Sequence, residues 1–378
     1  MAAWTSHGND FATRTEPLFR NNLEGYPFYR IPSLLAINAT LLLAFAEARG
    51  QRTDHGHVSL VMKRSMDGGA TWSPLSVVQA AAEGRKGTIG NPAPLYDASE
   101  GSVVLFYCRE NREIYSTRSS DFGDSWSAPQ TIAWSRPADW QWVATGPPAA
   151  LVTTSGQWVI PCDGLTGSFQ LWKADRVFSF ALTSDDKGLT WRQGPLLDGG
   201  NECQAAELQN GSLVLNMRSK EMVRLHSTSS DGGTTWSEPK RAPRPKGGVP
   251  DGNCQGSMIS LTHDCPGGAS CGMLLATSVG HGRKVLTART SRDGGDSWDH
   301  YAKLEAGPAG YSALAELSDG WAAVLYEAKW LLKPPPESKR SNPKPVEEDV
   351  IVFARVRVGA EAPQIITRPA MKMKRDEL

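Results

Sequence analysis

The sequence predicts an all-β protein whose sheets repeat around a ring, the architecture called a β-propeller. The first observation is an eight-residue pattern, Ser-x-Asp-x-Gly-x-Thr/Ser-Trp, that occurs five times. The second is that short segments rich in β-branched and aromatic residues separate the copies, whereas long amphipathic helical periodicity is absent. Repeats spread in this way are typical of propeller blades. The five copies begin at Ser65, Ser119, Ser184, Ser229 and Ser291.

Each position of the repeat has a physical reason. Asp and Ser side chains bond to nearby backbone amides and hold a turn, and Gly supplies a positive φ without strain. Thr or Ser followed by Trp restarts a strand, and the indole buries a large apolar surface. A single Asp-Gly turn is a weak signal, but five copies with the Trp in register predict repeated hairpins. We expect these hairpins on the outside of the ring, away from its centre.

Taken in order, the chain begins with a polar arm over residues 1–20 and continues as one domain over residues 21–358. An exposed Pro-rich loop is expected over residues 333–348 and a tail without core pattern over residues 359–378. A helical turn is one interpretation of Cys203–Leu208. The predicted strands are Ser33–Ala46, Val58–Lys63, Val103–Cys108, Trp158–Pro161, Val177–Thr183, Leu213–Arg218, Met273–Val279, Val285–Thr290, Trp321–Glu327 and Val350–Val358.

Composition excludes several classes of partner. Lys and Arg number 40 and Asp and Glu number 40, so no basic excess favours nucleic acid or a membrane surface. No apolar run approaches the roughly 20 residues of a membrane-spanning helix, so no integral membrane segment is expected. The six Cys are too few and scattered for a disulfide scaffold. Cys265 and Cys271 could pair in an oxidising compartment or, with His263, bind zinc, but a surface loop is the better interpretation, and no metal or cofactor is expected.

The two ends of the sequence indicate different compartments. Residues 1–16 lack the apolar core of a signal peptide, which favours a cytoplasmic protein. The last four residues, Arg375-Asp376-Glu377-Leu378, resemble an ER-retrieval tetrapeptide, which acts only after entry into the lumen. We expect a cytoplasmic location, with the ER lumen or secretory pathway as the alternative if a leader precedes this sequence.

Three arginines lie where predicted strands begin or end, and strand alternation would aim each at a defined face. Taken alone, each is an ordinary charge at a strand end. Three converging guanidiniums, however, form a receptor for a carboxylate, because Arg pairs bidentately and stays charged. They are Arg30 in Tyr29-Arg30-Ile31-Pro32, Arg218 in Leu215–Ser219 and Arg283 in His281–Arg283.

Together with the repeated turns, these arginines resemble the exo-α-sialidase (neuraminidase) family, which are six-bladed β-propellers with turns called Asp boxes. The resemblance runs from about Tyr26 to Phe353 and is greatest to single-domain animal sialidases. Motifs outside the turns make the resemblance more specific. They are Leu43–Arg49 (LAFAEAR), Asn91–Asp97 (NPAPLYD), Glu202–Glu207 (ECQAAE), Cys254–Ser257 (CQGS) and Leu325–Ala328 (LYEA).

The resemblance implies a retaining exo-α-sialidase that removes terminal sialic acids through a covalent glycosyl-tyrosine. Arg30, Arg218 and Arg283 would grip the substrate carboxylate. Tyr311 would be the nucleophile, as in sialidases generally, because a carboxylate in that role would be repelled by the substrate's own carboxylate. Glu202 would be its base, since a phenol with a pKa of roughly 10 needs one.

Further site residues come from the same resemblance. Asp54 matches the acid/base that protonates the leaving oxygen and later activates water. Glu327 matches the carboxylate that orients the first arginine. Arg49, Asn91 and Gln255 match positions that line the pocket. The implied protein is a monomer without a cofactor, acting on sialylated glycoproteins, glycolipids or oligosaccharides.

Each of these residues also has an ordinary structural interpretation, such as a solvated loop Asp or a packed Tyr, but together they occur in the family's order. Two alternatives stay open: a trans-sialidase, and a non-catalytic propeller that binds sialylated glycans. Cys162-Asp163-Gly164 stand where mammalian relatives place tyrosines for the glycerol arm. Trp140 and Trp142 stand where relatives have one Trp, as sugar-stacking or core residues. Preference among N-acetyl, N-glycolyl and deaminated (Kdn) acids therefore stays open.

Overall fold

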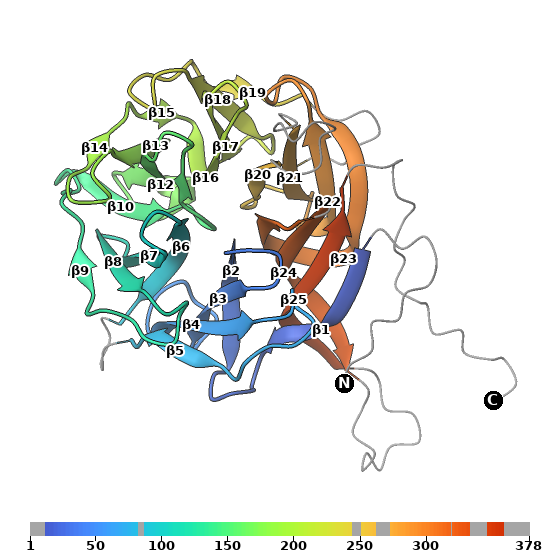
Figure 1. Ribbon diagram of the computed structural model, residues 1–378. Helices are drawn as coiled ribbons and strands as arrows, with labels where there is room; N and C mark the ends of the chain where they lie inside the picture. Colours follow the sequence, from blue (N-terminus) through green and yellow to red (C-terminus); the bar gives the residue numbers. More distant parts are fainter. Residues whose placement is uncertain are drawn as a thin grey trace, which may run out of the picture.

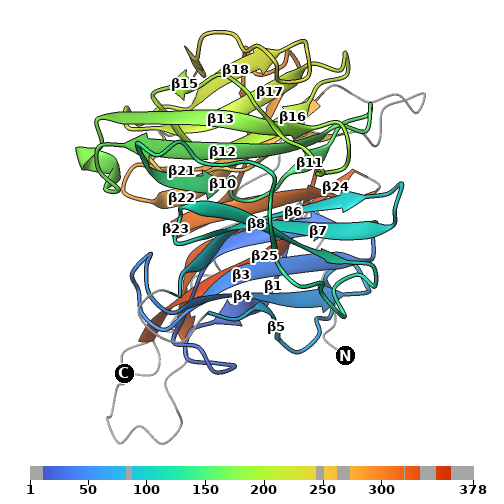
Figure 2. The ribbon, with the colours of Figure 1, turned by 90° about the vertical axis from the view of Figure 1, so that its left-hand side faces the viewer.

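The sheets surround a central axis and extend outward from it, in a propeller-like arrangement (Figure 1). The computed structural model describes residues 12–81, 87–243, 251–261, 273–318, 320–332 and 346–358. Viewed from the side, the longer strands run roughly along the axis (Figure 2). In this part of the chain the helical content is one 3-10 turn, η1 (Leu171–Lys173), and no helix is long and apolar enough to cross a membrane. The all-β prediction is confirmed.

All five sheets are antiparallel. In four of them the main strands follow one another in sequence order, as expected where short turns join consecutive strands. The first holds β2 (Phe28–Ala36), β3 (Leu42–Arg49), β4 (Val58–Ser65) and β5 (Ser76–Gln79). The second holds β6 (Ile89–Asp97), β7 (Ser102–Arg109), β8 (Glu113–Ser119) and β9 (Gln130–Thr131). The third holds β10 (Trp140–Thr145), β11 (Leu151–Val152), β12 (Trp158–Thr166), β13 (Arg176–Ser184), β14 (Arg192–Gln193) and β15 (Leu197–Asp198). The fourth holds β16 (Gly200–Glu207), β17 (Leu213–Ser219), β18 (Leu225–Ser229) and β19 (Lys240–Arg241).

The fifth sheet has seven strands in the order β1-β25-β24-β23-β22-β21-β20. They are β1 (Ala12–Arg20), β20 (Met258–Leu261), β21 (Met273–Gly280), β22 (Lys284–Ser291), β23 (Asp299–Glu316), β24 (Trp321–Leu332) and β25 (Val346–Arg357). The long strand β23 pairs with β22 as far as Pro308 and with β24 from Ala309 onward. Register shifts accompany this change of partner, so one strand serves two parts of the ring.

The first strand corrects the expected N-terminal arm. Residues 12–20 form β1, which pairs with β25 at the edge of the fifth sheet. Leu18 and Phe19 are buried, and Arg20 lies 3.3 Å from Glu348. The prediction failed because polar residues and a Pro dominate the segment, whereas an edge strand tolerates both.

Eight of the ten predicted strands lie within observed ones, and Val350–Val358 overruns β25 by one residue. Ser33–Ala46 is wrong as a single strand, because it spans the hairpin of β2 and β3. Asn38 makes that turn, since its Oδ1 accepts the amide N–H groups of Thr40 and Leu41 at 2.9 and 2.8 Å.

The helical interpretation of Cys203–Leu208 is also wrong, because most of this segment belongs to β16. Cys203 and Ala205 pack into one apolar cluster and Ala206 into another, so the strand is buried on both faces. Cys265, Cys271 and the tail over 359–378 lie outside the described residues. So does the Pro-rich loop, except for its last three residues, which begin β25.

The five repeated turns share one set of hydrogen bonds. In each, the Ser hydroxyl donates to the Asp carboxylate and accepts the amide N–H of the Gly. The carboxylate also accepts the amide of the Thr or Ser four residues later, at 2.8–2.9 Å. In Figure 1 four of these turns lead into the outer strands β5, β9, β14 and β19. The fifth leads into β23.

Apolar side chains fill the spaces between neighbouring sheets. Phe106 of β7 packs edge-on against Trp158 of β12, with ring centroids 6.2 Å apart. Phe45 of β3 packs in the same way against Trp126, in the turn after β8, at 6.1 Å. These contacts fix the sheets around the axis and thereby place the inner strands relative to one another.

Candidate functional site

A cavity of about 580 Å³ lies where the inner strands of several sheets meet, and its size is that of a small-molecule site. Seven of the ten residues predicted for the site line it, from four of the five sheets and the segments that join their strands. They are Arg30, Asp54, Asn91, Glu202, Arg218, Arg283 and Tyr311. The structure therefore brings together residues that are distant in sequence.

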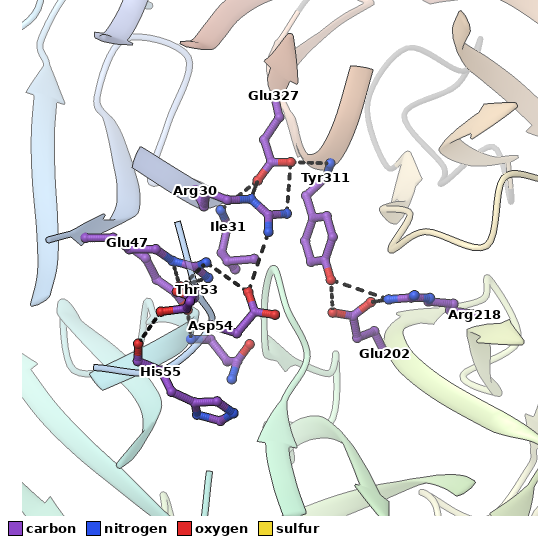
Figure 3. A network of polar contacts seen from close by, with 12 residues as sticks. Arg30, Ile31, Glu47, Thr53, Asp54, His55, Glu202, Arg218, Tyr311 and Glu327 are labelled. Atoms are coloured by element: carbon purple, nitrogen blue, oxygen red, sulfur yellow. Dashed lines mark hydrogen bonds and ion pairs between the residues drawn. The ribbon is translucent and has the colours of Figure 1, made fainter. Parts of the chain in front are cut away.

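Glu327 of β24 accepts hydrogen bonds from residues of β2 and of β23, which lie near opposite ends of the sequence. One carboxylate oxygen accepts Arg30 Nε and the amide of Ile31, both at 3.0 Å (Figure 3). The other accepts Arg30 Nη2 and the amide of Tyr311, both at 3.2 Å. Gly310 leaves room for this carboxylate, because a Cβ there would lie 2.2 Å from Glu327 Oε2.

These contacts determine the pKa of Glu327 and hold the backbone conformation of Ile31. Burial raises the pKa of Glu327, but Arg30 and the two amides outweigh that effect, so its pKa lies below the ordinary value. Ile31 has a φ of 53°, which is strained for a β-branched residue. The bond from its amide to the carboxylate holds this conformation, which sets the direction of the neighbouring Arg30.

Tyr311 of β23, Glu202 of β16 and Arg218 of β17 form a second chain of contacts. The Tyr311 hydroxyl donates to one Glu202 oxygen, and Arg218 Nη1 donates to the other at 2.6 Å (Figure 3). Arg218 Nε is held by Asn253 at 2.9 Å. Burial and then the charge of Glu202 raise the pKa of Tyr311 well above its ordinary value, against the effect of Arg218. The resting phenol is therefore neutral.

The three predicted arginines converge on Tyr311. Arg30 and Arg283 lie over its ring, 5.1 and 5.7 Å from the centroid, and Arg218 Nη1 lies 3.4 Å from its hydroxyl. Arg30 and Arg218 have carboxylate partners, whereas Arg283 has none among the described residues. The cluster therefore offers one unneutralised guanidinium at the cavity, a suitable place for an anion.

Asp54 stands on the loop between β3 and β4, with its side chain 64% exposed. Arg49 Nη1 donates to it at 2.8 Å, and Arg30 Nη1 lies 3.6 Å away. Partial burial favours the neutral acid, but the charges of Arg49 and Arg30 outweigh it and lower the pKa of Asp54. Arg49 is itself fixed by Glu47, to which it donates from Nε and Nη2.

Two residues predicted to line the pocket lie behind it instead. Arg49 is buried and supports Asp54 through its guanidinium. Gln255 is buried and bonds in both directions with the backbone of Ser312, next to Tyr311, at 2.9 Å. Protein groups bond to the polar atoms of both side chains, so their assignment to the substrate site stays a prediction. Asn91 does line the cavity, with a φ of 57°.

The opposite wall of the cavity consists of residues outside the predicted site, although Trp142 was one of two expected sugar-stacking or core residues and Asp163 lies in the segment compared with the glycerol-arm tyrosines of relatives. Trp142 and Ala144 of β10 and Asp163 and Leu165 of β12 line it. The two neighbouring Trp residues have different surroundings. Trp142 lines the cavity, whereas Trp140 packs in the core against Phe178 and Phe180. His55 lies edge-on to Trp142 and Phe169 at the rim. An Asp between Cys and Gly carries no pattern that would have identified it.

No group of three or more His, Cys, Asp or Glu side chains with the geometry of a metal site occurs in the described ranges. The four Cys residues that the structure describes are buried thiols without disulfide partners. The polar groups that line the cavity are guanidiniums, carboxyls, amides, one phenol, one imidazole, one ammonium group and the indoles of two Trp residues.

Comparison with known proteins identifies relatives over most of the chain. The model of the BNR repeat-like domain family matches residues 40–324. The chain is 29% identical over 351 residues to a sialidase of Micromonospora viridifaciens, covering 82% of this chain and 52% of that protein. It thus spans about half the length of that relative. To Sialidase-2 of Rattus norvegicus it is 32% identical over 264 residues, covering 62% of this chain and 68% of that protein.

Solved structures give the same picture of the fold. Trypanosoma rangeli sialidase, solved with 2,3-difluorosialic acid as a covalent intermediate, matches with a TM-score of 0.68 and 20% identity. The match covers 91% of this chain and 58% of that one. A likeness at this identity supports the propeller-like arrangement of the sheets.

Proposed function

Because the chain belongs to the sialidase family, we propose that it is a retaining exo-α-sialidase that hydrolyses terminal sialic acids of glycoproteins, glycolipids or oligosaccharides. The observation that carries this proposal is the Tyr311–Glu202 pair enclosed by three arginines. A non-catalytic glycan-binding propeller would need the arginines, but it would have no use for a buried phenol bonded to a carboxylate.

Arg30, Arg218 and Arg283 bind the substrate carboxylate in this proposal. Guanidiniums bind carboxylates bidentately and keep their charge, and Arg283 has no competing carboxylate among the described residues. Glu327 holds Arg30 in place, so its direction is set before the substrate arrives. The anomeric carbon, which carries the carboxylate, then lies beside the Tyr311 hydroxyl.

Tyr311 attacks the anomeric carbon and transfers its proton to Glu202, with which it already shares a hydrogen bond. The raised pKa of Tyr311 keeps the phenol neutral at rest, so it does not repel the incoming carboxylate. The phenolate character that develops during attack is stabilised by the neighbouring Arg218 and Arg30. The product of this step is a covalent glycosyl-tyrosine.

Asp54 protonates the leaving oxygen and then activates water for the second displacement. Its position on an exposed loop suits a group that must meet the departing sugar or lipid. At rest Asp54 is ionised, because Arg49 and Arg30 lower its pKa. A bound substrate carboxylate neutralises part of the charge of Arg30, which raises the pKa of Asp54 and allows it to take up a proton.

We also propose that the ring has six blades and that the five repeated turns are Asp boxes. Four blades are the separate sheets, and the seven-stranded sheet supplies two, divided within β23 where its partner changes from β22 to β24. In this count β1 is the outer strand of the sixth blade. The proposed enzyme works as a monomer, without a cofactor, in the cytoplasm or, with a leader, in the secretory pathway.

The proposal is tested by trapping the intermediate with 2,3-difluorosialic acid and measuring the intact mass of the protein. The expected result is one covalent sialyl adduct that maps to Tyr311, absent from the Tyr311→Phe variant. Turnover of a fluorogenic α-sialoside, with NMR of the first-formed product, should show retention of the anomeric configuration. Folded protein without turnover between pH 4 and 8, roughly the usual glycosidase range, would contradict the proposal. Transfer to lactose in place of hydrolysis would identify a trans-sialidase.

A further inference from the structure

Asp163 of β12 is a buried carboxyl group that nothing in the proposed reaction uses. Its side chain is 1% exposed, yet the residue lines the central cavity. Asn201 Nδ2 donates to its Oδ2 at 2.9 Å. Its Oδ1 is buried and completes no hydrogen bond of good geometry with a described residue, although the Trp142 indole N–H acts on the carboxyl group. A buried polar atom without a partner costs stability, and beside a cavity a group of a bound ligand can complete its hydrogen bond.

The protonation of Asp163 follows from its surroundings. Burial and the nearby charge of Glu202 raise the pKa of Asp163 well above its ordinary value, against the effects of Arg218 and the Trp142 indole. Burial and the charge of Glu202 both favour the neutral acid over the carboxylate. In the neutral acid the proton belongs on Oδ1, since Oδ2 already accepts a hydrogen bond.

The strands place Asp163 on the wall of the cavity, within range of the charges of Glu202 and Arg218. Asp163 pairs with Ala144, and Leu165 pairs with Trp142, so these four residues share one face of the third sheet. All four line the cavity. In Figure 1, β10 and β12 lie across the ring from β24, which carries the Glu327 that orients Arg30. A sugar whose carboxylate meets the arginines turns its far end toward this wall.

We propose that Asp163 is a specificity residue whose Oδ1 forms a hydrogen bond with a hydroxyl group of the sugar. The inference rests on the proposed sialidase function and adds the part of the substrate that this wall recognises. The other side chains on this face, Trp142, Ala144 and Leu165, are mainly apolar, so the acid supplies the directional contact. Two hydroxyl sources fit: the glycerol arm, and the C5 hydroxyl of a deaminated acid.

The test measures kcat/KM on three fluorogenic glycosides: N-acetylneuraminic acid, Kdn, and N-acetylneuraminic acid with its glycerol arm shortened by periodate and borohydride. For Asp163→Ala we expect a loss of about 10- to 100-fold on substrates that carry the recognised hydroxyl and little loss on those that lack it. A loss on both full-length substrates that vanishes for the shortened one assigns the glycerol arm. A loss confined to Kdn assigns the C5 hydroxyl.

The Asp163→Asn variant tests whether residue 163 acts as a neutral hydrogen-bond donor or through a negative charge. An amide can accept from Asn201 and still donate from the other position, so this variant should stay within about threefold of wild type on all three substrates. Asp97→Ala is the matched control, because Asp97 is a buried carboxyl outside the cavity whose loss acts on folding. Its effect should be equal for all three substrates.

An equal loss for Asp163→Ala on all three substrates would overturn the inference and leave a structural role. A loss for Asp163→Asn as large as that for Asp163→Ala would overturn the neutral donor. If folded wild-type protein turns over none of the glycosides, the proposed function fails separately. The same variants are then compared by calorimetric titration with the 2,3-didehydro analogues of the three acids, where an unchanged Kd for Asp163→Ala contradicts the inference.

Discussion

The turns at the outside of the ring and the site at its centre both depend on carboxylates that accept several hydrogen bonds, but they obtain their donors differently. In the turn at Ser229, every donor to Asp231 lies within four residues of it. At the centre, Glu327 accepts from Arg30, which is 297 positions away. A local device can be repeated along a chain, whereas the central one exists only once all sheets are in place. The first therefore contributes to stability and the second to chemistry.

The largest expected effect is at the centre. Tyr311→Phe should lower kcat on a fluorogenic α-sialoside by at least about 10³-fold, because the nucleophilic oxygen is lost while the ring still packs under the arginines. Thermal denaturation should change little. Tyr107→Phe is the control, since Tyr107 is also buried but does not line the cavity. Full activity of Tyr311→Phe would contradict the role of Tyr311 as nucleophile and thus the contrast between a catalytic centre and a stabilising periphery.

A smaller effect should distinguish the role of Asp54 from that of Tyr311. Asp54→Asn should lower kcat/KM about 10²-fold on sialyllactose, whose leaving oxygen needs a proton, and less than about 10-fold on a methylumbelliferyl glycoside. Phenolate leaves without full protonation, and kcat/KM reports the step before the covalent intermediate. Equal losses on both substrates would show that Asp54 positions the site and transfers no proton.

At the periphery the expected effect is on stability alone. Asp67→Ala removes bonds from Ser65 and from the amide and hydroxyl of Thr71, so chemical denaturation should show a loss of about 1–2 kcal/mol. The kcat of the folded variant should equal that of wild type. Met66→Ala, at an exposed position in the same turn, is the control. Activity lost by folded Asp67→Ala would mean that the turns reach the site.

The smallest effect concerns pH. Bonds from Thr190 and Ser184 lower the pKa of Asp186 from 3.8 to about 2. Because the folded pKa lies below the unfolded one, the contribution of this carboxylate is present above about pH 4 and is lost as the pH falls through about 2. The difference in melting temperature between wild type and Asp186→Asn should therefore be small, owing to solvent exposure, and should shrink between pH 4 and 2. A constant difference would contradict the hydrogen-bonding explanation.

The contrast between contacts that are local in sequence and contacts that are distant in sequence also explains how much of the fold the sequence predicts. Segments such as Val177–Thr183 are apolar enough to be recognised as strands, and they are strands. The strand β6 was missed, since Pro92 and Pro94 interrupt its pattern, although both lie where the chain tolerates them. β1 was missed because its partner, β25, is at the other end of the sequence.

The local sequence pattern gives less information about the site than about the fold. Nothing near Glu327 or Gln255 in the sequence states what these side chains contact, and only the resemblance to sialidases pointed to them. In the structure Glu327 bonds to Arg30, and Gln255 bonds to the backbone of Ser312. For Asp163 the resemblance marked only its segment, Cys162–Gly164, as a place where relatives have tyrosines, and it gave the carboxyl group no role. Its unpartnered oxygen appears only when its surroundings are known.

The pairing of β1 with β25 has a consequence for how this protein is made. Ala12 lies opposite Val356, so β1 can meet its partner only after all the strands between them have been synthesised. Until then β1 is an unpaired edge, and the fifth sheet lacks its outer strand. Closure of the ring is thus a late, long-range step of folding, and the nascent chain is exposed to association with other chains until β25 has been synthesised.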